Sequence, residues 1–351
     1  MAKGELIAIF DADFLPPRNF INETAPFFSN PKLGMVQTRW DHLNEEFSLI
    51  TRAQAFGLAG HFAVEQNGRN AAGYFINFNG TAGVWRKACI VDAGNWQADT
   101  LTEDLDLSYR AQMRGWKFLF LHDVVTPSEL PAEINALKSQ QYRWTKGAVE
   151  TARKILPRLW KSKLPLNLKI HSTLHLTNNF VYPFILLLAL LNIPLLIIKN
   201  QVPASEHYFF IFAFFLISFW ASFLFYAISQ KSLYPDWKKR MVLFPLFMSG
   251  SMGFSVNNTQ AVIDGLLNVK TPFIRTPKYR LMGKTGAFVS RYRMRLNKGV
   301  IFEIFMALYC CVGVVVSFYY FELGILPFML MFFCGFGFIG YLSIKHYLKH
   351  E

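Results

Sequence analysis

The stretch "GELIAIFDADFLPP", residues 4–17, decides the fold prediction for the first half of the chain. Five apolar residues, Leu6–Phe10, run directly into Asp11-Ala12-Asp13 and a Pro-Pro turn signal. An apolar run of this length is typical of a fully buried strand in a parallel sheet. Open α/β sheets bind ligands at the carboxyl ends of their strands, and here that end carries two carboxylates. Because like charges repel, the arrangement predicts a bound cation.

The Asp-x-Asp motif occurs in ordinary surface turns, but its position after a buried strand favours a functional site. Hard cations such as Mg²⁺ or Mn²⁺ are held through one or two carboxylates together with substrate phosphates. We therefore expect a metal–diphosphate site, in which Asp13 is the direct metal ligand and Asp11 lies beside it.

The composition divides the chain into two parts. It has 351 residues, 52% of them hydrophobic, and a formal net charge of +13. Acids and bases are mixed in the first half, whereas the second half has long uncharged runs. This pattern predicts a soluble α/β domain followed by an all-α transmembrane domain. The four cysteines lack metal-ligand spacing and are interpreted as small buried hydrophobes.

Four runs in the second half are long enough to span a bilayer, at about 174–198, 207–229, 300–320 and 323–344. A fifth run, 241–267, contains several polar residues. The loop 268–299 has nine basic residues and no acid, so a span at 241–267 would place a basic loop outside. We expect 241–267 to be interfacial or re-entrant. The positive charge then belongs at the membrane surface rather than on a nucleic-acid site.

The stretch 145–170 has seven basic residues, and its apolar residues recur at helical spacing. It is interpreted as an amphipathic helix on the cytoplasmic leaflet, with an ordinary surface helix of the soluble domain as the alternative. The expected organisation is a catalytic domain over 1–145, an interface helix or linker over 146–172 and a membrane domain over 173–351. Asn178 and Asn179 either line a pathway or bond to neighbouring helices. Glu303 is expected at the headgroup level.

Residues 100–118, "TLTEDLDLSYRAQMRGWKF", predict a helix that starts at Thr102-Glu103-Asp104 and ends near Gly115. Thr102 is expected to cap the helix, with the two acids in its first turn. One reading is simply a well-capped helix. The functional reading makes one of the two carboxylates a general base that takes a proton from an attacking hydroxyl.

Two further stretches carry candidate binding residues. In "SQQYRWTKG", residues 139–147, the planar guanidinium of Arg143 suits phosphate oxygens, and Trp144 suits a sugar ring. An Arg-Trp pair beside a membrane helix is also a common anchor. In "INFNGTAGVWR", residues 76–86, glycines let backbone approach a ligand closely. The aromatic residues there belong either to the core, which we favour for Phe75 and Trp85, or to a sugar platform.

The order Asp-x-Asp, Phe-Asn-Gly-Thr, Thr-Glu-Asp, Gln-x-x-Arg-Trp and then membrane spans resembles the processive family 2 glycosyltransferases of the cellulose synthase superfamily. The stretches "FDADFLP", "NPKLGMVQTRW", "HFAVEQ", "FNGTAGVWR" and "SELPAEINALKSQQYRW" are most similar to the mannan- and glucan-synthase-like branch. "PFIRTPKY", residues 272–279, resembles a cytoplasmic loop beside the active site of such enzymes. The resemblance implies a partial GT-A-like nucleotide-sugar transferase domain.

What the resemblance implies for the site can be assigned by position. Asp104 is the general base with Glu103 beside it, and Asp11 and Asp13 bind Mg²⁺ or Mn²⁺ and the nucleotide diphosphate. The diphosphate and the end of the acceptor glycan are held by Gln140, Arg143 and Trp144, and the acceptor site is lined by Asn79, Gly80 and Thr81. The implied reaction is an inverting transfer of a hexose from UDP-glucose or GDP-mannose to a growing β-glycan, by a multi-pass protein of the inner or plasma membrane with a cytoplasmic catalytic domain.

In this family βαβ units precede Asp-x-Asp, and two or three of them need roughly 60–100 residues. Only ten residues precede Asp11 here, so we expect a C-terminal part of a longer enzyme. Two alternatives stay open at this point. One is a transferase that glycosylates a lipid carrier, and the other is a non-catalytic or inactive membrane subunit that needs a separate N-terminal half. The donor sugar, the linkage, the product length and partner subunits are not specified by the sequence.

Overall fold

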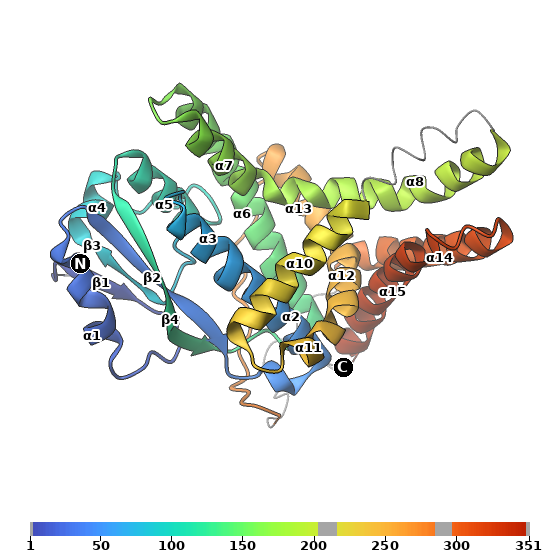
Figure 1. The fold of residues 1–351 in the computed structure, drawn as a ribbon, viewed down its shortest axis with the longest axis horizontal. Coiled ribbons are helices and arrows are strands. Elements are labelled where there is room, and N and C mark those ends of the chain that lie inside the picture. The colour runs from blue at the N-terminus through green and yellow to red at the C-terminus, as the bar shows by residue number, and fades with distance from the viewer. Residues whose placement is uncertain (1–2, 203–215, 285–296, 349–351) are drawn as a thin grey trace.

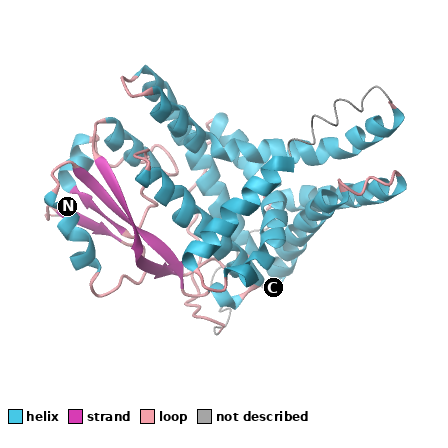
Figure 2. Cartoon of the chain, viewed as in Figure 1, coloured by secondary structure: helices cyan, strands magenta, loops and turns pink. Residues whose placement is uncertain are grey.

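The structure is a computed structural model that describes residues 3–202, 216–284 and 297–348. Its first half combines strands and helices, and its second half is helical (Figures 1 and 2). The elements of the first half are β1 (Leu6–Ile9), α1 (Phe20–Thr24), η1 (Ala25–Ser29), β2 (Leu33–His42), η2 (Glu45–Phe47), α2 (Leu49–Gly60), the π-helix η3 (His61–Gln66), α3 (Asn67–Ala71), β3 (Gly83–Arg86), α4 (Lys87–Asp92), α5 (Glu103–Met113) and β4 (Lys117–Ser128).

The second half begins with a long helix that leads out of the sheet domain. Its elements are α6 (Ile134–Lys161), α7 (Leu166–Thr177), η4 (Asn178–Phe180), α8 (Val181–Gln201), α10 (Leu216–Leu233), α11 (Trp237–Arg240), η7 (Met241–Leu243), α12 (Phe244–Gly253), α13 (Ser255–Leu266), α14 (Gly299–Tyr319) and α15 (Leu326–Leu348). The predicted order, an α/β part followed by an all-α part, is confirmed.

The sheet is mixed, with the strand order β1-β3-β2-β4. β1 and β2 both pair antiparallel with β3, and only β2 and β4 are parallel. The prediction of a fully buried parallel strand at Leu6–Phe10 is therefore wrong. β1 lies at one edge of the described sheet and is only partly buried, because one side of an edge strand has no neighbouring strand. Asp11 nevertheless follows its carboxyl end directly.

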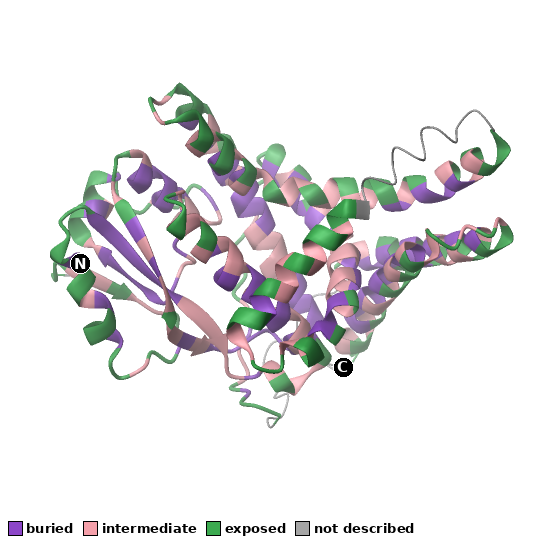
Figure 3. Ribbon diagram, in the orientation of Figure 1, coloured by how far each residue is buried: buried purple, intermediate pink, exposed green. Residues whose placement is uncertain are grey.

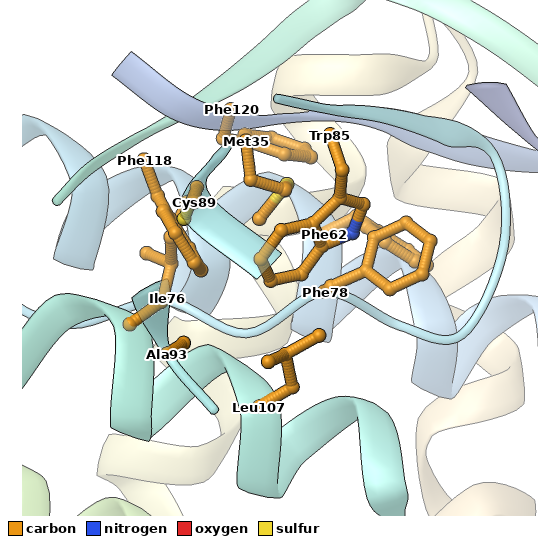
Figure 4. Packing of buried hydrophobic residues seen from close by; sticks show 11 residues of the cluster. Met35, Phe62, Ile76, Phe78, Trp85, Cys89, Ala93, Leu107, Phe118 and Phe120 are labelled. Carbon is orange, nitrogen blue, oxygen red and sulfur yellow. The ribbon is translucent and has the colours of Figure 1, made fainter. Parts of the chain in front are cut away.

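Alternate residues of the central strands enter two separate clusters, one on each face of the sheet. Met35 and Trp85 pair across β2 and β3 and lie in the cluster of Figure 4, which α5 covers through Leu107. The next pair along, Val36 and Val84, points to the other face, beneath α1 and η1. This two-residue alternation fixes the register, since a slip of one residue would exchange the two faces.

Helix α6 passes through the expected domain boundary at residue 145. It runs from Ile134 to Lys161 without interruption, and the Glu133 carboxylate caps it by accepting hydrogen bonds from the backbone N–H groups of Asn135 and Ala136. Its apolar face, expected on the lipid leaflet, instead packs inside the protein against α5 and α7, where Ile155 and Leu159 are fully buried. The helical spacing was right, but the surface that it meets is protein.

Among the described residues, three helical segments are long and apolar enough to cross a bilayer: Leu166–Gln201, Gly299–Tyr319 and Leu326–Leu348. They correspond to three of the four expected spans. α14 presents large apolar side chains outward, with Ile301 76% and Leu308 64% exposed, as suits a lipid-facing helix. Figure 3 shows this alternation of buried and exposed residues along α14 and α15. Much of the expected span 207–229 lies outside the described residues; the remainder belongs to α10.

The stretch 241–267 forms η7, α12 and α13 rather than one continuous helix. Its placement at an interface or as a re-entrant segment stays a prediction. Two expectations concern polar residues of the helical part. Asn179 accepts a hydrogen bond from Thr145 of α6, which matches the helix-bonding alternative. Glu303 is fully buried and its Oε1 lies 2.6 Å from Lys138 Nζ of α6; its level relative to the headgroups stays a prediction.

Candidate active site

A cavity of about 900 Å³ lies between the sheet domain and the helical part. It collects residues from the end of β1, the loop before β3, the start of α5, the first half of α6 and the segment after α13, and it extends to residues of α8, α12 and α15. Nine of the ten predicted site residues line it: Asp11, Asp13, Asn79, Gly80, Glu103, Asp104, Gln140, Arg143 and Trp144. The predicted residues, which are spread over more than 130 positions, therefore share one cavity.

Thr81 is the exception among the predicted residues. It is buried, and its Oγ1 accepts a hydrogen bond of 2.8 Å from the backbone N–H of Asp11. Thr81 is thus a support for the Asp-x-Asp turn rather than part of the cavity wall. Phe78, considered as a sugar platform, lies with Trp85 in the core below the sheet, and Phe75 packs against Tyr109.

The Asp-x-Asp turn carries concentrated negative charge. Partial burial raises the pKa of Asp11, and the neighbouring Asp13 carboxylate raises it further. Asp13 Oδ2 forms an ion pair with the ammonium of Lys278, 2.7 Å away, and has no other partner among the described residues. Within the described ranges no group of three or more His, Cys, Asp or Glu side chains converges on a metal position. Two carboxylates fit a hard divalent cation that takes its other ligands from phosphates and water.

Asp104 is a buried carboxylate on the cavity wall with a raised pKa. Burial raises the pKa of Asp104 to about 7, and the negative charges of Glu103 and Asp11 add to the effect. Asp104 lies in the first turn of α5, as predicted, but Thr102 does not cap that helix through its side chain. Its Oγ1 instead lies 3.3 Å from Thr151 Oγ1 of α6, so it links α5 to α6.

The loop before β3 brings backbone against this carboxylate. Gly80 has φ +81°, a conformation that favours glycine, and a Cβ atom on it would lie 3.2 Å from Asp104 Oδ2. Gln37 of β2 holds the same loop: its Oε1 accepts a hydrogen bond from the Asn79 backbone N–H. The loop and the start of α5 therefore form one wall of the cavity.

The opposite wall is formed by α6 and the segment 268–284. Arg143 donates a hydrogen bond of 2.9 Å to Thr276 Oγ1, and its guanidinium lies 4.5 Å from the centre of the Phe273 ring. Burial lowers the pKa of Arg143, whose charge faces Asp11 and Glu103. The predicted phosphate-binding cation is thus positioned opposite the Asp-x-Asp turn.

Sequence reasoning missed the anchor of this segment. Glu129, which follows β4, accepts hydrogen bonds of 2.8 Å from the backbone N–H groups of Tyr279 and Arg280, and its carbonyl oxygen accepts one from Lys278 Nζ. These contacts hold Lys278 beside Asp13. The only signal in the sequence was the likeness of residues 272–279 to a loop near an active site, which does not identify Glu129 as its partner.

The first half of the chain is similar in sequence to known proteins. Residues 1–147 match the family model described as Glycosyltransferase like family 2. "Probable glucomannan 4-beta-mannosyltransferase 4" from Oryza sativa subsp. japonica is 44% identical over 179 residues, which are 51% of this chain and 32% of that protein. "Glucomannan 4-beta-mannosyltransferase 1" from Cyamopsis tetragonoloba is 44% identical over 169 residues, 48% of this chain and 32% of that protein. The match spans about a third of the length of these curated relatives.

Among solved structures, the mannosyltransferase PcManGT from Pyrobaculum calidifontis, in complex with GDP-Man and Mn²⁺, overlaps with a TM-score of 0.42 and 15% identity. The overlap covers 77% of this chain and 64% of that chain.

Proposed function

We propose, from the match of residues 1–147 to the family 2 glycosyltransferase model, that this chain belongs to a membrane-bound, processive, inverting hexosyltransferase that extends a β-linked glycan. The observation that carries the proposal is the shared cavity. A carboxylate with a pKa near neutrality, an Asp-x-Asp turn and an Arg-Trp pair all line it. One base, one acidic turn and one cationic wall suit a single displacement on a nucleotide sugar.

The proposed reaction starts with the hydroxyl of the acceptor glycan. Asp104 takes its proton while the hydroxyl oxygen bonds to the anomeric carbon and the bond from that carbon to the diphosphate breaks. A pKa of about 7 lets Asp104 be unprotonated near neutral pH and still basic enough to accept the proton. No second carboxylate is needed as a nucleophile, so the anomeric configuration inverts.

Arg143 and Lys278 are positioned for the other end of the reaction. Both are cations on the wall that faces the Asp-x-Asp turn, and both are held from behind, by Thr276 and Glu129 respectively. They suit the oxygens of a nucleotide diphosphate, whose charge increases as it leaves. Asp13 and Asp11 would hold Mg²⁺ or Mn²⁺, which when bound neutralises part of the diphosphate charge.

We propose GDP-mannose as the donor because the relatives at 44% identity are named mannosyltransferases; UDP-glucose is the alternative. We further propose that the catalytic domain faces the cytoplasm and that the membrane is the plasma membrane. The basic segment 268–284, which contributes Lys278 to the cavity, supports a cytoplasmic position under the positive-inside rule.

The test is transfer by the detergent-purified protein, supplied with radiolabelled GDP-mannose or UDP-glucose, Mn²⁺ or Mg²⁺ and a β-1,4-linked oligosaccharide. The expected result is a longer labelled glycan that a β-mannanase degrades. Asp104→Asn should remove the activity, whereas Asp99→Asn, an exposed aspartate that pairs with Lys154 away from the cavity, should retain it. Transfer that is unchanged in Asp104→Asn, or no transfer with either donor, would refute the proposal.

A further inference from the structure

His61 lines the same cavity, and the proposed function leaves it without a role. It begins the π-helix η3, between α2 and α3. Single π-helical turns inside longer helices are rare and recur at functional sites. The turn directs His61 toward the loop before β3, where its ring meets Asn79.

His61 is fixed on both of its ring nitrogens. Nδ1 lies 2.9 Å from Glu65 Oε2, and Nε2 lies 3.1 Å from Asn79 Oδ1. Glu65 in turn accepts Arg69 NH2 on its other oxygen at 2.9 Å. Burial raises the pKa of Glu65, but the charges of His61 and Arg69 outweigh it and hold that pKa well below its usual value. Glu65 is therefore an anion, and it holds the Nδ1 side of the His61 ring while the Nε2 side faces the Asn79 oxygen.

These contacts determine which end of the Asn79 amide is available. The oxygen is occupied, because Asn77 Nδ2 also donates to it at 2.8 Å. The nitrogen, Nδ2, is buried without a hydrogen-bond partner in the described part of the chain. A buried unpaired donor costs free energy, and a ligand that accepts from it would remove that cost. Asn79 precedes Gly80, which faces the proposed base Asp104, so a ligand there would lie beside the reacting hydroxyl.

We propose that His61, oriented by Glu65 and Arg69, is a positioning residue that turns the Asn79 amide so that Nδ2 donates to a hydroxyl oxygen of the acceptor glycan. His61 itself acts only through Asn79. The inference rests on the proposed function, because it assumes that the ligand beside Asp104 is a glycan. It predicts that removal of the imidazole weakens acceptor binding and leaves the nucleotide site unaffected.

The experiment is calorimetric titration of the full chain in detergent with β-1,4-mannohexaose and, separately, with GDP in the presence of Mn²⁺. Loss of one neutral hydrogen bond corresponds to roughly a tenfold loss of affinity. Asn79→Ala and His61→Phe should each weaken mannohexaose binding by about tenfold, and the double variant should be no weaker than either single variant. His61→Gln, which keeps a donor at the position of Nε2, should stay within about threefold of the wild type. GDP affinity should be unchanged in all of them.

The matched control is His122→Phe, the same substitution on β4 at a histidine that does not line the cavity. If His61→Phe only loosened the packing, it would weaken the binding of both mannohexaose and GDP, and His61→Gln would be as weak as His61→Phe. Its effect would also add to that of Asn79→Ala. Tight mannohexaose binding by both the wild type and His61→Phe would overturn the inference and leave the proposed function standing. No binding by the wild type to mannohexaose or to a β-1,4-glucan hexamer would overturn the proposed acceptor site, and the role of His61 with it.

Discussion

Gly80 faces Asp104 so closely that a Cβ atom placed on Gly80 would lie 3.2 Å from the Asp104 Oδ2 atom. Glycine is therefore favoured at position 80 for two reasons. A side chain would crowd the Asp104 carboxylate, and the φ of +81° lies in the left-handed region. The contact leaves no side chain between the loop and the carboxylate. It makes the direction in which Asp104 points depend on the residue at position 80.

Gly80→Ala tests that dependence. The left-handed backbone should cost roughly 1–2 kcal/mol of stability, and the added methyl group should push the Asp104 carboxylate aside and lower the transfer rate by more than about tenfold. Gly73→Ala is the matched control, because Gly73 has φ +74° with open space around it. Both variants should lose similar thermal stability, and only Gly80→Ala should lose activity. Equal rates in the two variants would show that the contact does not position the base.

The pH dependence of transfer follows from the pKa of Asp104 near 7. The base acts only when unprotonated, so the rate with saturating donor and acceptor should rise between about pH 6 and about pH 8 and then level off. Donor and acceptor affinities measured at the same pH values separate this effect from binding. A rate that is flat across this range would place the base elsewhere.

The free energy of unfolding should depend on the same Asp104 carboxyl group, but it should fall as pH rises, whereas the transfer rate should rise. The folded-state pKa of Asp104 is raised above its usual value of 3.8, so the folded protein binds the proton more tightly than the unfolded chain does. Stability is thus lost as pH rises through the window from about 4 to about 7.

Asp104→Asn removes this cost, and its melting temperature in detergent should exceed that of the wild type at about pH 8, by an amount that disappears near about pH 4. Asp99→Asn should show no such gain. A melting temperature for Asp104→Asn below that of the wild type at high pH would contradict the raised pKa.

The sequence was most informative where a local pattern and its partner lie close together in the chain. The position of Asp104 in the first turn of α5 was readable, because the signals that start a helix are local. The Leu6–Phe10 run was misread since an apolar run does not tell an edge strand from a central one. α6 was misread because its apolar stripe says only that something covers it, and here that is α5, α7 and other helices rather than lipid.

Contacts between distant segments were not predictable from one sequence. Glu129 and Lys278 are separated by 149 positions, and nothing local in either segment names the other. His61 and Glu65 do share a helical spacing of four, a signal that was available but is common in ordinary surface pairs. That Asn79 bonds to the His61–Glu65 pair could be seen only from the fold of the loop before β3.

Lys278 should compete with a metal ion for Asp13, since its ammonium lies 2.7 Å from Asp13 Oδ2. Lys278→Met is expected to raise the affinity for Mn²⁺ alone by roughly fivefold, and to weaken GDP binding in the presence of Mn²⁺ because a phosphate-binding cation is lost. Paramagnetic resonance of free Mn²⁺ measures the first effect and calorimetry the second. Lys284→Met, in the same segment but away from the cavity wall, should change neither. Weaker binding of Mn²⁺ alone in Lys278→Met would refute the competition.

The Lys138–Glu303 pair joins α6, which carries Arg143 and Trp144, to the membrane helix α14. Both side chains are buried, with 2.6 Å between Nζ and Oε1. Removing one partner leaves a buried charge without compensation, so Glu303→Gln or Lys138→Met alone should cost about 3–5 kcal/mol of stability.

Replacing both partners by apolar residues removes both charges, so Lys138→Met combined with Glu303→Leu should recover most of the loss. Thermal melting in detergent gives the stability of the wild type, the two single variants and the double variant. If the pair also fixes the position of α6, the double variant should be stable yet show weaker GDP binding, because Arg143 lies five residues along the same helix. If the double variant recovers both stability and GDP affinity, the pair contributes to packing only. If the losses of stability in the double variant are additive, the two side chains do not form an ion pair.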